Sequence, residues 1–376
     1  MSGSGLGGPT RHCASLSTAL AAVCVLSANP STSSGRPNSA QLAASSLQFF
    51  EIPVAPSLGH LACGPDRNIW VAEPLNAGVH RVDRAGIVTR FDIPKAPARE
   101  PFGLAWGSDG ALWFTAGPRG AVGRVSAGGV FLGEIVLPLP LPQIGSDLAQ
   151  GADGALWVLA FNRPDVPYLA RFSPAGSIDL FPIGGGGLDS GGLISGPDGY
   201  IWFTELSKSR MDRASLSGVI QSLPLPGGAA ALTTGPDRNI WVVMMASNEI
   251  ARVGVDGSVT GFPIPTPMAF PQAIATGPDG AIWFTESGLN KIGRLDPSTG
   301  KIAEYDVPTP DAFPQFLAAC GGDLWVTEAR VGKVARIVVA PLASTSDVPA
   351  LPGSGVIILA LLLAVIGAVG VRGFVR

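Results

Sequence analysis

One short phrase recurs seven times in this chain of 376 residues and limits what it can fold into. A complete copy reads Gly-Pro-Asp-Gly-Ala-Ile-Trp at Gly277–Trp283, and the last copy is shortened to Gly-Gly-Asp-Leu-Trp at Gly321–Trp325. Successive Trp residues of the phrase stand 43, 44, 45, 39, 42 and 42 residues apart. A period of about 40–45 residues is typical of β-propellers, in which each repeat forms one four-stranded blade. The spacing therefore predicts an all-β, seven-bladed propeller. The Trp residues are Trp70, Trp113, Trp157, Trp202, Trp241, Trp283 and Trp325.

Each repeat carries the pattern of a four-stranded antiparallel blade. The Pro-Asp-Gly of the phrase is typical of a tight turn, because Pro fixes φ, Asp bonds its own backbone and Gly accepts a positive φ. The segment Ile282–Thr285 after the turn is rich in β-branched and aromatic residues, which favour strands. A third strand ends near an Arg, as at Arg294, and a fourth follows, as in Ile302–Pro308.

The two ends of the repeat array complement each other. The seventh repeat stops after its third strand, at Lys333–Val339, whereas Leu47–Pro53 matches a fourth strand and precedes the first repeat. We expect this N-terminal strand to pair into the seventh blade, because closure removes the exposed edge that an open stack would leave. The competing fold is a linear β-solenoid.

The segments outside the repeats predict export. The apolar stretch Leu16–Leu26 follows Arg11 and is typical of a secretory signal. The run Val356–Val371 is long enough for a tilted membrane helix when the preceding apolar residues are added, and Arg follows it. The tail resembles bacterial sorting signals of the Ile-Pro-Thr-Leu type, with a plain single-span anchor as the alternative. The expected order is a signal peptide (1–28), a flexible linker (29–46), the propeller (47–340), a second linker (341–352) and a transmembrane or sorting tail (353–376).

The amino-acid composition limits which kinds of partner this protein can bind. The net charge is −3, only 14% of residues are charged, and no basic stripe is visible, which argues against nucleic acid. We expect a monomer in the cell envelope, which contacts the membrane through its C-terminal segment. The expected ligand is a small molecule or a peptide, bound at the propeller rim.

Two cysteines, Cys63 and Cys320, stand just before the turns of the first and seventh repeats, whose blades are neighbours in a closed ring. An even cysteine count suits an oxidising compartment. Equivalent positions on adjacent blades can, however, lie beyond the ~4.4–6.8 Å Cα separation that a disulfide needs. Two buried free thiols are thus the favoured interpretation, and a disulfide is the alternative.

Strand order predicts where a ligand would bind. The start of each first strand and the end of each second strand share one rim of a blade, and four second strands end in Glu. Such carboxylates can bind a cation or supply a general base; the alternative is that they are solvated residues paired with turn amides. These residues are Glu73, Glu205, Glu286 and Glu328.

The first strands contribute Phe102, Gln272 and Gln315 to the same rim. A Gln amide can orient a polar ligand but cannot move protons at neutral pH. His60 stands one residue out of this register, so strand alternation predicts that it points away. No His is therefore predicted at the rim.

The phrase Gly277–Glu286, together with Lys291–Leu295 downstream, resembles the streptogramin B lyase family, also called virginiamycin B lyases. The resemblance extends over all seven repeats. It implies a propeller that serves antibiotic resistance by opening a cyclic depsipeptide, through elimination at its ester, with Mg²⁺ assisting.

The same resemblance implies a catalytic His at the position of Gln272, a catalytic Glu at Phe270 and a further His at Ala230. Only the Glu that ends the second strand is retained, as Glu286, which becomes the candidate catalytic and Mg²⁺-binding carboxylate. Because Gln cannot act as the base, we predict a lyase-like, ligand-binding propeller whose lyase chemistry is lost or altered. Phe270 would then contact the ligand. The alternatives are an active streptogramin B lyase and a metal-assisted, lactonase-type hydrolase.

Overall fold

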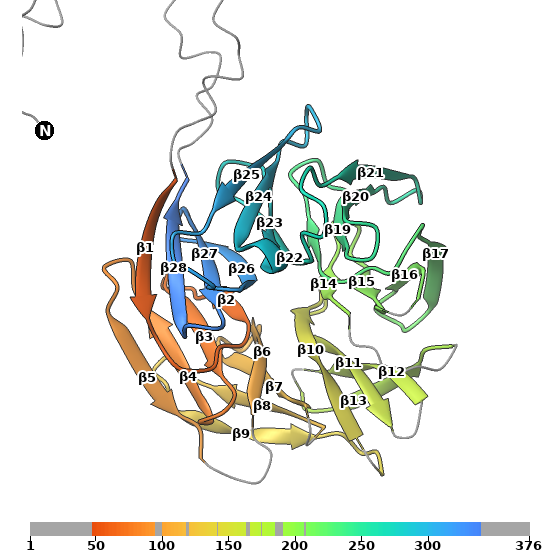
Figure 1. The fold of residues 1–376 in the computed structure, drawn as a ribbon. Helices are drawn as coiled ribbons and strands as arrows, with labels where there is room; N and C mark the ends of the chain where they lie inside the picture. The colour runs from red at the N-terminus through yellow and green to blue at the C-terminus, as the bar shows by residue number, and fades with distance from the viewer. Residues whose placement is uncertain are drawn as a thin grey trace, which may run out of the picture. The chain divides into compact units, whose positions relative to one another are not determined.

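The computed structural model describes residues 47–94, 100–117, 120–140, 142–162, 166–173, 175–184, 191–206 and 208–339. Within them, 28 strands form seven four-stranded antiparallel sheets that follow one another as the blades of a propeller (Figure 1). The predicted fold class is confirmed. The predicted signal peptide, the linkers and the C-terminal tail lie outside the described residues. No helix in the described ranges is long and apolar enough to cross a bilayer.

The first three blades each begin with the strand nearest the ring centre. Blade 1 contains β2 (Leu61–Cys63), β3 (Ile69–Glu73), β4 (Gly78–Val82) and β5 (Val88–Asp92). Blade 2 contains β6 (Pro101–Trp106), β7 (Leu112–Ala116), β8 (Ala121–Val125) and β9 (Phe131–Val136). Blade 3 contains β10 (Pro142–Gln150), β11 (Leu156–Asn162), β12 (Val166–Phe172) and β13 (Ile178–Pro182).

The next three blades repeat this order. Blade 4 contains β14 (Leu193–Ser195), β15 (Ile201–Thr204), β16 (Arg210–Ala214) and β17 (Ile220–Pro224). Blade 5 contains β18 (Leu232–Thr234), β19 (Ile240–Met244), β20 (Glu249–Val253) and β21 (Val259–Pro263). Blade 6 contains β22 (Pro271–Thr276), β23 (Ile282–Glu286), β24 (Lys291–Leu295) and β25 (Ile302–Asp306). The short 3₁₀ helix η3 (Ser287–Leu289) follows β23.

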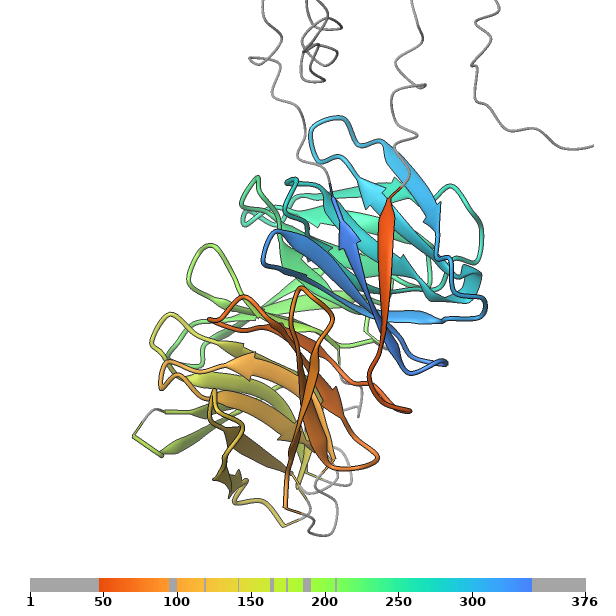
Figure 2. The ribbon, with the colours of Figure 1, turned by 90° about the vertical axis from the view of Figure 1, so that its left-hand side faces the viewer.

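Blade 7 is built from both ends of the propeller. It contains β26 (Pro314–Cys320), β27 (Asp323–Glu328), β28 (Lys333–Val338) and the N-terminal strand β1 (Gln48–Pro53). Strand β1 runs antiparallel to β28, from Gln48 opposite Val338 to Pro53 opposite Lys333, and Figure 2 shows the two strands side by side. The predicted closure of the ring by the N-terminal strand is confirmed.

The recurring phrase works as a hydrogen-bonded unit that links three strands of a blade. In blade 6, Asp279 Oδ1 accepts hydrogen bonds from Trp283 Nε1 (3.0 Å) and from the Ala281 amide (3.2 Å). Its other oxygen accepts one from Arg294 Nε at 2.8 Å. The Trp is buried between blades while its polar N–H is satisfied, which avoids the cost of an unpaired donor. This unit explains why an Arg follows each Trp at a regular distance.

The Trp–Asp hydrogen bond of this unit is missing from the two blades that meet where the ring closes, although each blade keeps its Arg–Asp pair, Arg81–Asp66 at 4.0 Å and Arg336–Asp323 at 3.8 Å. Trp70 Nε1 of blade 1 is buried without a hydrogen-bond partner, and Trp325 Nε1 of blade 7 donates instead to the Cys320 carbonyl at 3.3 Å. Blades 1 and 7 are joined by other contacts, and we call this junction, which contains Cys63, Cys320, Arg84 and Asp323, the seam.

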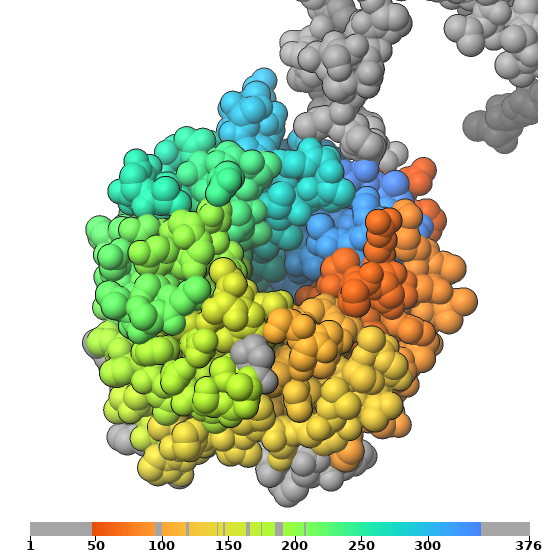
Figure 3. All heavy atoms as spheres, turned by 180° about the vertical axis from the view of Figure 1, so that it is seen from behind, coloured from red at the N-terminus to blue at the C-terminus, as the bar shows by residue number. Residues whose placement is uncertain are grey.

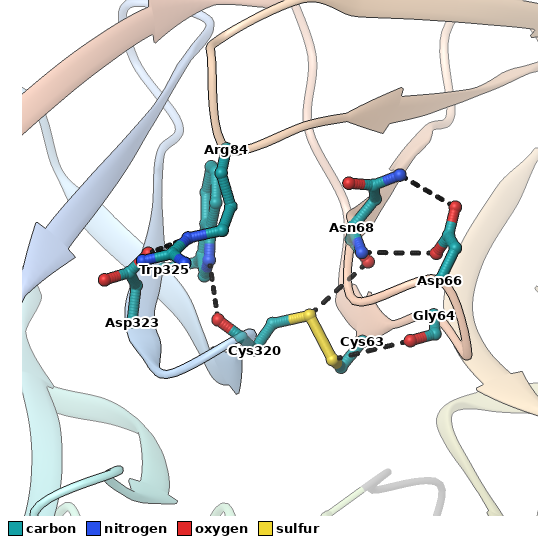
Figure 4. The surroundings of a disulfide bond; sticks show 8 residues. All are labelled: Cys63, Gly64, Asp66, Asn68, Arg84, Cys320, Asp323 and Trp325. Atoms are coloured by element: carbon teal, nitrogen blue, oxygen red, sulfur yellow. Dashed lines mark hydrogen bonds and ion pairs between the residues drawn. A yellow bond between two sulfur atoms is a disulfide. The ribbon is translucent and has the colours of Figure 1, made fainter.

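A disulfide joins Cys63 and Cys320 across the seam (Figure 4). The two Cα atoms are 5.1 Å apart, so the favoured interpretation of two free thiols was wrong. The separation is small because both cysteines end innermost strands, β2 and β26, which converge near the ring centre. Next to the disulfide, Arg84 Nε of blade 1 donates to Asp323 Oδ2 of blade 7 at 2.9 Å.

Candidate functional site

The innermost strands enclose a cavity at the centre of the ring. Its volume is about 440 Å³, and residues from all seven blades line it. Figure 3 shows one end of the ring, where the surface is hollowed at the centre. Ligand sites in proteins commonly measure about 300–1,000 Å³ and combine apolar walls with a few polar groups. The polar side chains in this lining are His60, Asp147, Gln272 and Gln315.

Gln272, Gln315 and Phe102, which strand order assigned to the rim, line the cavity. In each of their strands the pairing with the next strand is interrupted, as between Pro271 and Ile274 in β22. There the Ala273 amide donates to Thr285 Oγ1 (3.0 Å) instead of to a ladder carbonyl. Such a β-bulge redirects side chains next to a strand end, so consecutive residues can face the cavity.

His60 also lines the cavity, although strand alternation predicts that it points away. The prediction was wrong because β2 begins only at Leu61, so His60 precedes the regular ladder in which side chains alternate. Its backbone is fixed by a neighbouring blade instead: the His60 amide donates to the Phe102 carbonyl at 2.9 Å. The imidazole packs on Phe316, with ring centroids 4.0 Å apart.

Asp147, which no sequence pattern indicated, lies in the cavity beside His60. Its carboxylate Oδ1 is 2.9 Å from His60 Nδ1, and each side chain is about a fifth exposed, at 20% and 21%. Asp147 lies where the ladder of β10 is interrupted, between Ile144 and Leu148, so the regular register of the repeats does not predict its direction. The one feature of the sequence that could have indicated Asp147 is that it is an acidic residue in an innermost strand, β10. Among the described lining residues, His60 and Asp147 are the two with ionisable side chains.

The contact between His60 and Asp147 determines which ring nitrogen of His60 carries the proton. A carboxylate accepts hydrogen bonds only, so Nδ1 of His60 is the nitrogen that carries the proton. In the neutral ring, Nε2 is then the basic atom, with a lone pair available to a ligand. This arrangement places a proton-accepting nitrogen, oriented by a carboxylate, inside the cavity.

The four Glu residues predicted at the rim are buried and do not line the cavity. Glu73 lies within its own blade, where it accepts hydrogen bonds from Arg90 Nε (3.0 Å) and Asn76 Nδ2 (2.5 Å) and is 2.8 Å from His80 Nε2. Burial disfavours its charge, but the hydrogen bonds from Asn76, His80 and Arg90 outweigh this and lower its pKa. Glu205 is similarly paired with Lys208 and Arg210. These two carboxylates are structural.

Glu286 and Glu328 are fully buried, and neither carboxylate has a hydrogen-bond partner within the described residues. Burial raises the pKa of Glu286 to about 7, the nearby charge of Glu304 raises it further, and Lys291 opposes both effects. Burial also raises the pKa of Glu328. Glu286 is therefore about half protonated at pH 7 and largely protonated below it, and the shift at Glu328 favours its protonated form in the same direction.

These carboxylates do not fit the Mg²⁺ that the family resemblance implies. Mg²⁺ keeps several of its waters and binds accessible carboxylate oxygens, whereas Glu286 is 0% exposed. No group of three or more His, Cys, Asp or Glu side chains in the described ranges could hold a metal ion.

Phe270 stands outside the cavity lining, on the loop before β22. It adopts a positive φ of 49° and is 50% exposed. Its ring lies against Gly288 of η3, where an added Cβ would approach Phe270 Cδ2 to 2.6 Å. The predicted contact between Phe270 and a ligand thus requires a ligand that extends beyond the cavity.

Replacing the buried carboxyl of Glu286 is expected to change how stability depends on pH. Its folded pKa of about 7 exceeds the ordinary 4.5, so the folded state binds more protons between these values. Stability must then fall as pH rises through this window, by up to about 3 kcal/mol. Glu286→Gln cannot titrate and should be more stable than the wild type at pH 8, as measured by urea unfolding at several pH values.

Glu73→Gln is the matched control with the opposite sign. The lowered pKa of Glu73 contributes stability above its ordinary pKa, and this is lost as pH falls. At pH 8 the Glu73 variant should therefore be less stable than the wild type. Parallel stability–pH curves for Glu286→Gln and the wild type would contradict the prediction.

Comparison with known proteins points to one family. The sequence profile described as "Virginiamycin B lyase family" matches residues 39–230 and 146–350. A solved streptogramin B lyase is 26% identical, with a TM-score of 0.72, over 78% of this chain and 98% of that one. Virginiamycin B lyase from Staphylococcus aureus is 27% identical, with a TM-score of 0.71, over 78% and 100%.

A third solved structure holds a ligand. It is a catalytically inactive histidine-to-alanine variant of the S. aureus virginiamycin B lyase with quinupristin. It is 27% identical to this chain, with a TM-score of 0.72, over 78% of this chain and all of that one. No curated protein matches the chain in sequence.

Proposed function

Because the chain belongs to the virginiamycin B lyase family, we propose that its central cavity binds a cyclic depsipeptide or a related uncharged peptide. The observation that carries the proposal is the cavity of about 440 Å³, whose described lining residues are mostly apolar and include four polar side chains. A cavity of this kind buries apolar side chains of a ligand and orients it through few hydrogen bonds. The S. aureus variant solved with quinupristin supports the choice of ligand class.

The polar groups of the cavity suit amide and ester groups. Gln272 and Gln315 come from the adjacent strands β22 and β26, and each amide offers both donors and an acceptor. Asp147, the acidic residue among the described residues of the lining, is paired with His60. Burying a charged ligand without a partner would be costly, so we expect an uncharged contact surface on the ligand.

We further propose that the propeller works outside the cytoplasm. The Cys63–Cys320 disulfide supports this, because disulfides persist in oxidising compartments and are rare where thiols are kept reduced. Attachment to the membrane through the C-terminal apolar segment remains a proposal from the sequence.

Titration of the purified protein with quinupristin, followed by calorimetry, tests the binding proposal. We expect saturable binding with one ligand per chain. Ala231→Trp fills part of the lining and should weaken binding by about tenfold or more, which corresponds to a loss of about 1.4 kcal/mol. Ala127→Trp, on an exposed turn of blade 2, is the matched control and should bind like the wild type. Absence of saturable binding, or equal affinity in Ala231→Trp, would overturn the proposal.

A further inference from the structure

We propose that His60 and Asp147 form a catalytic acid–base pair, with His60 as the proton acceptor and Asp147 as the residue that positions it. The inference rests on the proposed function, because it places the reacting part of the bound peptide in the same cavity. It also moves the proton acceptor from the sixth blade, where the family resemblance puts it and this chain has Gln272, to the first blade.

The imidazole of His60 is held on several sides. Asp147 Oδ1 from blade 3 lies 2.9 Å from Nδ1, and the ring packs on Phe316 of blade 7 and near Phe102 of blade 2, with centroid distances of 4.0 Å and 5.4 Å. The His60 backbone donates to the Phe102 carbonyl at 2.9 Å and accepts from the Ala72 amide at 3.2 Å. A base held this firmly loses little orientational freedom when a ligand binds.

The charge arrangement favours proton transfer at Nε2. The Asp147 carboxylate fixes the proton on Nδ1 and stabilises the imidazolium that forms when Nε2 takes a second proton. Both side chains are about four-fifths shielded from solvent, which strengthens their interaction. Each also keeps enough exposure to face the cavity.

A second histidine–carboxylate pair shows what a purely structural version looks like. His80 and Glu73 are 2.8 Å apart, and each side chain is only 3% exposed. Here it is Nε2 that meets the carboxylate, while Nδ1 is buried without a hydrogen-bond partner. This pair lies outside the cavity lining, so it cannot reach a ligand. The contrast singles out His60 as the histidine placed for chemistry.

The step that this geometry supports is an elimination across an ester whose oxygen is bonded to the carbon β to a carbonyl. Nε2 of His60 removes the proton from Cα, the C–H electron pair becomes the Cα=Cβ double bond, and the Cβ–O bond breaks. The ester oxygen leaves with its acyl group as a carboxylate, and the proton on Nε2 passes to solvent. An amide N–H of Gln272 or Gln315 can stabilise the negative charge that develops on the carbonyl oxygen.

Incubation of the full-length protein with quinupristin, followed by mass spectrometry, tests the pair. We expect a ring-opened product of unchanged mass, because elimination adds no water. His60→Gln should lower kcat by about 10²–10⁴-fold while quinupristin binding and Tm stay near the wild-type values. Asp147→Asn should lower kcat by at least about tenfold with little change in KM, since it disturbs the tautomer and not the binding walls. His80→Gln removes the structural pair and should leave kcat unchanged.

The remaining outcomes would contradict either the catalytic pair, the elimination step or the proposed function. Quinupristin binding without any product, or product from His60→Gln at the wild-type rate, overturns the catalytic pair while the proposed function stands. A product heavier by one water overturns the elimination step. Absence of quinupristin binding overturns the proposed function and this inference with it.

A measurement on the wild type keeps the test valid if His60→Gln does not fold. Diethyl pyrocarbonate acylates accessible neutral imidazole nitrogens, so His60 should react, the buried His80 should not, and quinupristin should protect His60. An unreactive His60, or one that quinupristin does not protect, overturns the pair.

Discussion

Deletion of residues 47–53 is expected to lower the free energy of unfolding by roughly 4–8 kcal/mol. The deleted strand β1 pairs with β28 along six residues, buries Ile52 and packs Leu47 and Phe49 against the core of blade 7. Each backbone hydrogen bond contributes about 1 kcal/mol and the burial of Ile52 about 2 kcal/mol. The deletion also leaves β28 as an exposed edge, which favours association. Urea unfolding and light scattering measure the two effects.

A deletion of equal length just before the strand, residues 40–46, controls for shortening the chain. Within the strand, Ile52→Ala should reproduce part of the loss, whereas Phe50→Ala, at a side chain 44% exposed, should cost much less. Its ring contributes mainly a surface contact with Arg336, whose guanidinium carbon lies 4.4 Å from the ring centroid. An unchanged unfolding curve after deletion of β1 would mean that ring closure by this strand contributes no stability.

The fold was predictable because its determinants are local and repeated. Each phrase specifies a turn, a buried Trp and the distance to an Arg, and the Asp279–Trp283–Arg294 unit shows these elements bonded together. The match between the unfinished seventh repeat and the strand at residues 47–53 then required only that the ring close. Because the phrase occurs seven times, an irregular copy such as the shortened one at Gly321–Trp325 did not alter the predicted fold.

The site was less predictable because its residues lie where the repeats become irregular. His60 precedes β2, and Asp147 lies in a break of the β10 ladder, so neither follows the period-two alternation. Their directions depend on contacts with other blades, such as the hydrogen bond from the His60 amide to Phe102. A sequence pattern carries no information about such contacts between separate repeats.

The rim carboxylates show a second limit of prediction from the sequence, which concerns burial and pairing. Strand order correctly placed Glu73 and Glu286 at the ends of second strands. It could not show that Glu73 meets Arg90 from β5, or that Glu286 is buried without a hydrogen-bond partner. Burial and pairing depend on how adjacent strands and loops pack over the side chain, and these decide whether a carboxylate is charged.

Replacing both seam cysteines, Cys63→Ala with Cys320→Ala, is expected to lower the free energy of unfolding by about 5 kcal/mol. The two residues are 257 apart in sequence, so the disulfide closes a long loop and removes much entropy from the unfolded chain. Native contacts across the seam should persist without it, because Arg84 remains paired with Asp323 and its carbonyl accepts from Arg336. Urea unfolding of the double variant, and of the reduced wild type, should give the same loss.

Combining this change with the deletion of β1 identifies where the disulfide acts. If it constrains the unfolded chain, its removal costs the same with and without β1, and the two losses add to within about 0.5 kcal/mol. If it holds blades 1 and 7 together in the native ring, its removal costs more once β1 is gone, because fewer contacts, chiefly those of β2 with β26, then hold blade 7 to blade 1. Since the Arg84–Asp323 pair already joins the seam in the native ring, we expect additive losses. A clear excess in the combined variant would instead show that the disulfide supports the native seam.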